Sequence, residues 1–559
     1  MTPTNPALVS QRAVARLPRS ALIGLVASYA LPGMIGRDPW KDNDVRAFGF
    51  MLSLARGQSS WWEPAVAGQH AHDGGVLPYW LGAASIKLFS PLVDPALAAR
   101  LPFIALLCLV LALTWYSSYL LARGKAAQPL PFAFGGEAHP LDYARTIADG
   151  ALLALISTLG LLQLGHETTP EMMQWVAMSL YMTALCALER HARWALGALA
   201  AALLMLSSSG APSVSLLLGG VALAWVLLEE EERRMPKALG VASATAASVA
   251  VAFALHAWSW QLHAPGPVLK LAQMLLWFVW PTWLLAGWTL WRWRQHWRER
   301  HIVLPTVLSV VGLAVSLTMG GSKEALMLAA PPLAVLAAFA LPTLKRSVSA
   351  AIDWFSVFFF TAGALFFWVV YLAAQTGWPA PTARNIARVI PGFHGSFSVL
   401  TLCIAVAASV AWFALVRWRT SHQRHPLWKS LVLPAGGVAV CWTLLTTLCL
   451  PMLDHARSYR YLVEQLRTHV PASSCIEVPG VPVGMISALQ YFGGYRVHAG
   501  RDREPRGREC VYRLMALPGK SAVPPAPAGW QRVAVIRQRT VNSETAVVLR
   551  RTHADPSRR

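Results

Sequence analysis

Apolar runs long enough to cross a lipid bilayer recur along almost the whole chain, and they restrict its fold more than any other feature. A membrane-spanning helix needs about 20 mostly apolar residues, and the sequence contains roughly thirteen such runs. Backbone polar groups inside a bilayer must bond to each other, so runs of this kind fold as helices. The runs centre near residues 28, 110, 156, 180, 201, 221, 248, 280, 311, 334, 364, 406 and 440. The sequence therefore predicts a polytopic α-helical membrane protein.

The balance of residue types agrees with this prediction. Hydrophobic residues make up 55% of the 559 residues and charged residues only 13%, whereas soluble domains carry about 25% charged residues. A soluble globular protein is therefore excluded. The formal net charge of +21 does not indicate nucleic-acid binding, because the basic residues lie mostly between apolar runs or near the C-terminus. Basic residues in such places set topology and contact anionic lipid, so membrane lipid is the expected partner.

The distribution of basic residues predicts which loops lie in the cytoplasm. Cytoplasmic loops of membrane proteins are enriched in Lys and Arg. If the N-terminus is cytoplasmic, alternate loops such as residues 292–300 carry several basic groups, whereas the intervening loops 166–171 and 207–215 carry none. The pattern predicts that the first loop, residues 37–96, and the region after the last run both lie outside the cytoplasm.

The chain divides into a predicted membrane domain, residues 1–450, and a small α/β domain, residues 451–559. After Pro451 the composition becomes polar, and a predicted amphipathic helix over 457–470 precedes four strand-like runs, at 475–478, 510–514, 532–536 and 545–549. Cys475 and Cys510 both lie in this region. On the outer side of a membrane we expect them to form a disulfide, with two free thiols as the alternative.

The first outer loop concentrates charged residues that are scarce elsewhere. Asp42-Asn43-Asp44 precedes Arg46 at the start of an apolar periodicity that predicts a helix over 45–54 lying on the bilayer. The apolar segment 77–93 predicts a second interfacial or re-entrant helix. The alternative is helix capping, for which Asp and Asn are favoured; it explains one carboxylate at this position well, and two beside an arginine less well. A carboxylate can deprotonate an acceptor hydroxyl and an arginine can bind a phosphate, so this loop is the candidate site.

Three segments of this loop resemble the first extracytoplasmic loop of GT-C glycosyltransferases. They are Arg-Asp-Pro-Trp-Lys-Asp-Asn-Asp-Val-Arg-Ala-Phe-Gly over residues 37–49, and residues 62–68 and 77–83. The most similar groups are the bacterial 4-amino-4-deoxy-L-arabinose transferases and the protein O-mannosyltransferase-like enzymes. The resemblance implies a GT-C fold of about thirteen spans with a small periplasmic α/β domain. It also implies inverting transfer from an undecaprenyl-phosphate-linked sugar to a glycolipid, glycan or protein at the periplasmic face of the bacterial inner membrane.

The resemblance also assigns roles to single residues. Aligning Arg46 with the family arginine places Asn43 where relatives carry the catalytic aspartate, so Asp44, and after it Asp42, is the expected base. Gly74 stands where many relatives have a phosphate-binding lysine, so Arg46 or another cation must replace it. The residues expected to bind substrate are Arg46, Asn43, Asp73, Tyr79, Glu167, Glu171 and Lys323. For Glu171 the alternative is stabilisation of a helix N-terminus, and for Lys323 it is snorkelling at a span end.

The cofactor and the function class each have alternatives. Some relatives bind a divalent metal between residues that correspond to Asp73 and His263, and the alternative is an unliganded interfacial histidine. Besides a glycosyltransferase, the chain could be a transporter or flippase for a lipid-linked sugar. Transporters place polar groups near the bilayer midplane and often contain repeats, whereas these spans are nearly free of charge and show no repeat. A third class, a non-catalytic binder of polyprenyl phosphate, stays open because Asn43 cannot act as a base.

Overall fold

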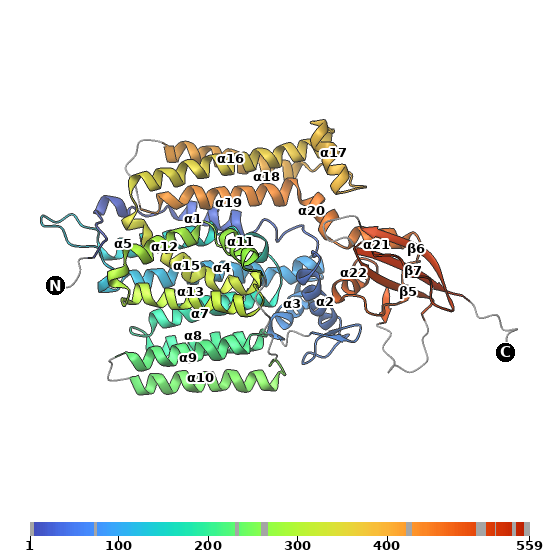
Figure 1. Ribbon diagram of the computed structural model, residues 1–559, viewed down its shortest axis with the longest axis horizontal. Coiled ribbons are helices and arrows are strands. Elements are labelled where there is room, and N and C mark those ends of the chain that lie inside the picture. The colour runs from blue at the N-terminus through green and yellow to red at the C-terminus, as the bar shows by residue number, and fades with distance from the viewer. Residues whose placement is uncertain are drawn as a thin grey trace.

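The computed structural model describes residues 5–71, 75–229, 234–258, 267–420, 427–498, 510–519, 521–538 and 544–552. It has two parts, a bundle of long helices and a C-terminal domain built on a β-sheet (Figure 1). Helices α2 (Asn43–Ala55) and α3 (Leu77–Phe89) of the first loop lie between the two parts, and the N-terminus lies at the opposite end of the bundle. The predicted fold class, a helical membrane bundle with a small C-terminal sheet domain, is confirmed.

The bundle consists of apolar helices separated by short loops. Its long helices are α1 (Arg19–Ala30), α4 (Pro95–Ala122), α5 (Pro140–Ile156), α7 (Pro170–Ala187), α8 (Ala192–Ser208), α9 (Pro212–Leu228), α10 (Arg234–Ala254), α11 (Val268–Phe278), α12 (Thr282–Arg292), α13 (Arg300–Thr318), α15 (Ala330–Ala340), α16 (Arg346–Thr376), α18 (Val399–Thr420) and α19 (Lys429–Leu448). The shorter helices are α6 (Leu161–Leu164), α14 (Lys323–Leu326) and α17 (Ala380–Val389), and a hairpin of β1 (Ala65–Val66) and β2 (Gln69–His70) follows α2.

Among the described residues, seven helices are long and apolar enough to cross a membrane, or eight if the bent pair α11–α12 counts as one span. Helices α8 and α9 are apolar but shorter. The chain is therefore a multi-pass membrane protein. Each predicted run centres inside one of the long helices, except the run at residue 280, which falls at the 91° bend between α11 and α12.

Burial separates the inner helices of the bundle from the outer ones. In the segment Lys323–Thr343, which contains α15, 94% of the most apolar stretch is buried inside the protein. In α16 and α18 the buried share of the corresponding stretch is only 22% and 11%. Helices α16 and α18 run together along one edge of the bundle (Figure 1). A helix that is apolar all round can be stable inside the protein or against lipid, so the outer helices present their apolar faces to the bilayer.

The C-terminal domain packs α21 (Arg460–Arg467) and α22 (Val483–Tyr491) against a five-stranded sheet, and α20 (Leu450–Arg457) joins it to α19 of the bundle. The strand order is β4 (Arg496–His498), β3 (Cys475–Glu477), β5 (Tyr512–Pro518), β7 (Glu544–Arg551) and β6 (Trp530–Gln538). Strand β3 runs parallel to β4 and β5, while β5, β7 and β6 are antiparallel. The structure joins Cys475 to Cys510, whose Cα atoms lie 5.0 Å apart.

The predicted helix over 457–470 is interrupted at Ser458. Its backbone is extended there, and its hydroxyl accepts a hydrogen bond from the backbone N–H of Arg460 (3.0 Å). A serine side chain that bonds to nearby backbone competes with helix formation. The chain therefore turns between α20 and α21, which brings Asp454 and Arg460 toward the first loop.

Helix α2 is enclosed by protein and does not lie on the bilayer as its apolar periodicity predicts. Most of its side chains, including the polar Asp44 and Ser53, are buried. Helix α3 covers one side and α22 of the C-terminal domain covers another. The apolar face that the sequence assigns to lipid is thus covered by α22 of the C-terminal domain. A hydrogen bond from Gln69 of the first loop to the carbonyl oxygen of Val481, 412 residues later, also joins the loop to this domain.

Gly49 allows α2 and α22 to approach closely. A Cβ atom at this position would lie 1.8 Å from Oγ and 2.6 Å from Cβ of Ser487. We expect Gly49→Ala to lower the free energy of unfolding by about 1–3 kcal/mol, as overpacking does, and to lower the Tm in detergent. Gly197→Ala in α8 is the matched control, because a Cβ atom there meets nothing within 4 Å. Equal Tm values for the two variants would contradict close packing at Gly49.

Candidate functional site

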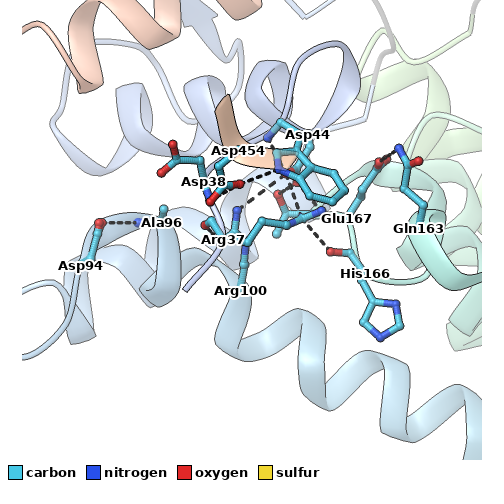
Figure 2. A network of polar contacts seen from close by, with 12 residues as sticks. Arg37, Asp38, Asp44, Asp94, Ala96, Arg100, Gln163, His166, Glu167 and Asp454 are labelled. Carbon is cyan, nitrogen blue, oxygen red and sulfur yellow. Dashed lines mark hydrogen bonds and ion pairs between the residues drawn. The ribbon is translucent and has the colours of Figure 1, made fainter. Parts of the chain in front are cut away.

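Asp44, in the first turn of α2, is the centre of a buried polar cluster (Figure 2). Its Oδ2 accepts hydrogen bonds from Arg37 Nη2 (3.0 Å) and from the backbone N–H of Trp40 (3.1 Å). Its Oδ1 accepts from both the backbone N–H and the hydroxyl of Thr168, each at 3.0 Å. Arg100, near the start of α4, lies 3.7 Å from Oδ2. We call these five residues the Asp44 cluster.

The charges of the Asp44 cluster do not balance. Burial alone would raise the pKa of Asp44, but the charges of Arg37 and Arg100 and the hydrogen bonds from Thr168 and Trp40 outweigh it and hold the pKa below its usual value. The carboxylate is therefore ionised at neutral pH. Within these five residues two arginines face one carboxylate, and both guanidinium groups are at most 3% exposed. The carboxylates of Asp38 and Asp454, outside the cluster, also act on Arg100. The cluster is suited to receive an anion.

Arg37 carries the donors that such an anion would use. Its Nη2 also donates to the carbonyl oxygen of His166 (2.9 Å), and its guanidinium lies 4.4 Å from the ring centroid of Trp40. Its Nε and Nη1 have no hydrogen-bond partner among the described residues. A buried N–H group without an acceptor costs free energy. A phosphate oxygen bound to the guanidinium would remove this cost through charge-assisted hydrogen bonds.

Glu167 lies beside the cluster, in the short loop before α7. Its Oε1 accepts a hydrogen bond from Gln163 Nε2 (2.7 Å), and the residue is 6% exposed. Burial and the negative charge of Asp44 raise the pKa of Glu167 to about 7, although Gln163, Arg37 and Lys323 act in the opposite direction. A carboxyl group with a pKa near neutrality can exchange a proton with a substrate at working pH.

Several residues predicted for the site lie around the cluster without joining it. Asp42 is exposed, with a left-handed backbone (φ 70°), and its side chain does not cap α2. Asn43 is half-buried as the first residue of α2. Arg46 follows Asp44 by two positions, which is about 200° around a helix, so it points to another side. The cations beside Asp44 are Arg37 and Arg100.

The remaining predicted residues fall in three places. Tyr79 is fully buried on α3, with its ring 5.2 Å from that of Phe50. Lys323 is exposed at the start of α14, close enough for its charge to act on Glu167. Asp73 and His263, the predicted metal ligands, lie outside the described residues. Tyr79 belongs to the buried core of the bundle, and its role in substrate binding stays a prediction.

A cavity of about 240 Å³ adjoins the loop that carries Glu167. It is bounded by the start of α7, the connection between α8 and α9, and the end of α13 with α14. Its polar lining consists of Glu171, Gln174, Ser209, Ser213, Thr318, Ser322 and Glu324, and its described lining contains no basic residue. Glu171 therefore faces this cavity, whereas Glu167 lies one turn earlier in the chain, beside the Asp44 cluster.

The C-terminal domain also contributes to the site. Asp454 Oδ1 accepts hydrogen bonds from Trp40 Nε1 (2.8 Å) and from the backbone N–H of Asp38 (3.3 Å). Burial and the charge of Asp38 raise the pKa of Asp454 to about 6. Arg460 binds both oxygens of Asp38, at 2.8 and 2.5 Å.

The predicted site residues omit Arg37, Arg100 and Asp454, each for a different reason. Arg100 was detectable, because it is a charged residue inside an apolar membrane run and such residues are usually functional. Arg37 lies within the first resembling segment, but nothing local shows that it meets Asp44. Asp454 has no local signal, since its role depends on contact with a loop 414 residues earlier.

One group of three potential metal ligands occurs in the described part of the chain. It consists of Cys475, His498 and Cys510 in the C-terminal sheet. The two cysteines are joined to each other there, so they offer no thiolate to a metal. The described residues thus add no metal site to the one predicted at Asp73 and His263.

Comparison with known proteins shows what this fold resembles. No protein-family model and no curated protein sequence matches the chain. Two similar solved structures are crystal structures of ArnT from Cupriavidus metallidurans, one bound to undecaprenyl phosphate and one in the apo state. The first has a TM-score of 0.61 and 14% sequence identity, and the match covers 96% of this chain and 97% of the ArnT chain. The second has a TM-score of 0.60 and 14% sequence identity, and the match covers 94% of this chain and 96% of the ArnT chain. The likeness shows a shared fold, which confirms the fold predicted from the loop resemblance.

Proposed function

We propose that this chain is an integral-membrane glycosyltransferase that moves a sugar from a polyprenyl-phosphate-linked donor to an envelope glycolipid, glycan or protein. The observation that carries the proposal is the likeness, over 96% of the chain, to an ArnT structure that holds undecaprenyl phosphate. The Asp44 cluster supports it, because it lies in the loop where the family resemblance expects the chemistry. We place the reaction at the periplasmic face of a bacterial inner membrane, on the side of the C-terminal domain.

Arg37 is the proposed ligand of the donor phosphate. During transfer, the bond between the anomeric carbon and the phosphate oxygen breaks, and the phosphate leaves with an additional negative charge. The unpartnered Nε and Nη1 of Arg37 can donate to it, and the positive charges of Arg37 and Arg100 stabilise it in a low-dielectric site. The acceptor oxygen attacks the opposite face of the sugar, so the anomeric configuration inverts.

Glu167 is the proposed base, and Asp44 the residue that holds the two arginines. Each oxygen of Asp44 already accepts two hydrogen bonds, and its lowered pKa makes it a weak proton acceptor. Glu167 has a pKa of about 7, so it can take the proton of an acceptor hydroxyl as the new C–O bond forms. This assignment replaces the expectation that Asp44 itself is the base.

The proposal is tested with purified protein in detergent, undecaprenyl-phosphate-linked sugars and extracted envelope lipids and glycans. We expect release of undecaprenyl phosphate and appearance of the sugar on one acceptor. If the sugar stays on its carrier but the carrier crosses the bilayer of proteoliposomes, the protein is a flippase. Binding of undecaprenyl phosphate without transfer or donor hydrolysis would identify a non-catalytic binder, the class that Asn43 leaves open.

A further inference from the structure

We infer that the C-terminal domain is a working part of the site and that Asp454 positions the loop carrying Arg37 and Asp44. This inference rests on the proposed function, since it concerns the placement of Arg37 for the donor phosphate. We call residues 37–44 the strap. Asp454 does not belong to the Asp44 cluster and is a positioning residue, because it acts through Trp40.

A single oxygen of Asp454 accepts hydrogen bonds from two residues of the strap. Asp454 Oδ1 accepts from the indole Nε1 of Trp40 (2.8 Å) and from the backbone N–H of Asp38 (3.3 Å). The backbone N–H of Trp40 donates to Asp44 (3.1 Å), and the Trp40 ring lies 4.4 Å from the guanidinium of Arg37. Trp40 therefore connects Asp454 to both charged partners of the central ion pair.

Other groups of the domain hold neighbouring positions of the strap. Arg460 of α21 binds the Asp38 carboxylate through two hydrogen bonds. The backbone N–H of Lys41 donates to the carbonyl oxygen of Arg457 (2.8 Å), and the Lys41 ammonium lies 3.7 Å from Glu544 of β7. Asp38, Trp40 and Lys41 are thus each bound to a different group of the C-terminal domain.

The strap depends on these contacts because it has little structure of its own. Residues 37–40 form neither helix nor strand, and Asp42 adopts a left-handed backbone. The internal hydrogen bonds of the strap join Arg37 and Trp40 to Asp44, whereas the bonds of Asp38 and Lys41 described above run to the C-terminal domain. A misplacement of about 1 Å in a catalytic group can cost about 100-fold in rate, so removing the acceptor for Trp40 should affect the reaction itself.

Asp454→Ala and Asp454→Asn test the inference as a pair. Alanine removes both hydrogen bonds, whereas asparagine keeps an Oδ1 that accepts from Trp40 and Asp38. We expect alanine to lower kcat by about 10- to 100-fold and asparagine to remain near wild type. Arg513→Ala is the control for general destabilisation, because it breaks the Arg513–Glu477 pair (3.0 Å) inside the sheet, away from the strap. It should lower the Tm without lowering kcat.

Hydrogen exchange of the strap amides separates this inference from the proposed function. Exchange over residues 37–44 should be faster in Asp454→Ala than in wild type, and unchanged in Asp454→Asn and Arg513→Ala. If wild type transfers no sugar, the proposed function fails, while exchange still decides whether Asp454 holds the strap. Unchanged exchange in Asp454→Ala, or a kcat loss no larger than that of Arg513→Ala, overturns the inference.

Discussion

Asp44→Ala is expected to abolish sugar transfer and to lower the free energy of unfolding by about 3–5 kcal/mol. The Asp44 side chain is 1% exposed and is the ion-pair partner of Arg37 and Arg100. Its removal would leave two buried guanidinium groups without their ion-pair partner, and it would also leave the N–H groups of Trp40 and Thr168 without their acceptor. The transfer assay measures the loss of transfer, and denaturant unfolding in detergent measures the loss of stability.

Two further variants separate stability from catalysis at this position. In Asp44→Ala with Arg37→Met, one unpaired charge is gone, so part of the lost stability should return while transfer stays absent. Asp44→Asn keeps the size of the side chain and its acceptor for Thr168 but not its charge, so it should fall between wild type and alanine in stability. If Asp44→Ala unfolds at the same denaturant concentration as wild type, the buried ion pair described here does not form.

Glu167→Gln is expected to reduce the transfer rate by about 100- to 10,000-fold while increasing stability above neutral pH. Because the folded-state pKa of Glu167, about 7, lies above its ordinary value of 4.5, the protonated form is favoured by folding. This stabilisation is complete below pH 4.5 and is lost as the pH rises through 7. Glutamine resembles the protonated form, so the variant should be more stable at pH 8 by on the order of 3 kcal/mol, and equally stable at pH 4.

The pH dependence of transfer tests the same residue independently. Wild-type transfer should rise as the pH passes through about 7, because the base must lose its proton before it can accept another. Asp42→Asn is the matched control, since Asp42 is the second base expected from the family resemblance and its side chain is exposed. If Asp42→Asn abolishes transfer and Glu167→Gln does not, the base is Asp42 at the start of α2.

The apolar runs predicted the positions of the helices well, because backbone polar groups in an apolar run of a membrane protein must bond to each other as a helix. They predicted the number of spans less well, since seven or eight of the described helices are long and apolar enough to cross a membrane. The strand-like runs from Cys475 onward also correspond to strands β3, β5, β6 and β7. The same local reasoning was wrong about α2, whose apolar face meets α22 and not lipid. An apolar face shows that something covers it, but it does not show what.

The sequence by itself determined that this protein is a helical membrane bundle with a small C-terminal domain, and it pointed to Asp44 of the first loop as a candidate site residue. Both predictions rest on residues that are close together in the sequence, namely the apolar runs and the motif of the first loop. Only the tertiary structure decided which groups surround Asp44, because Thr168 and Arg100 come from other parts of the chain and Asp454 acts through Trp40. Electrostatic interactions depend on distance in space, and the distance along the chain between Asp44 and Thr168, 124 residues, carries no information about it.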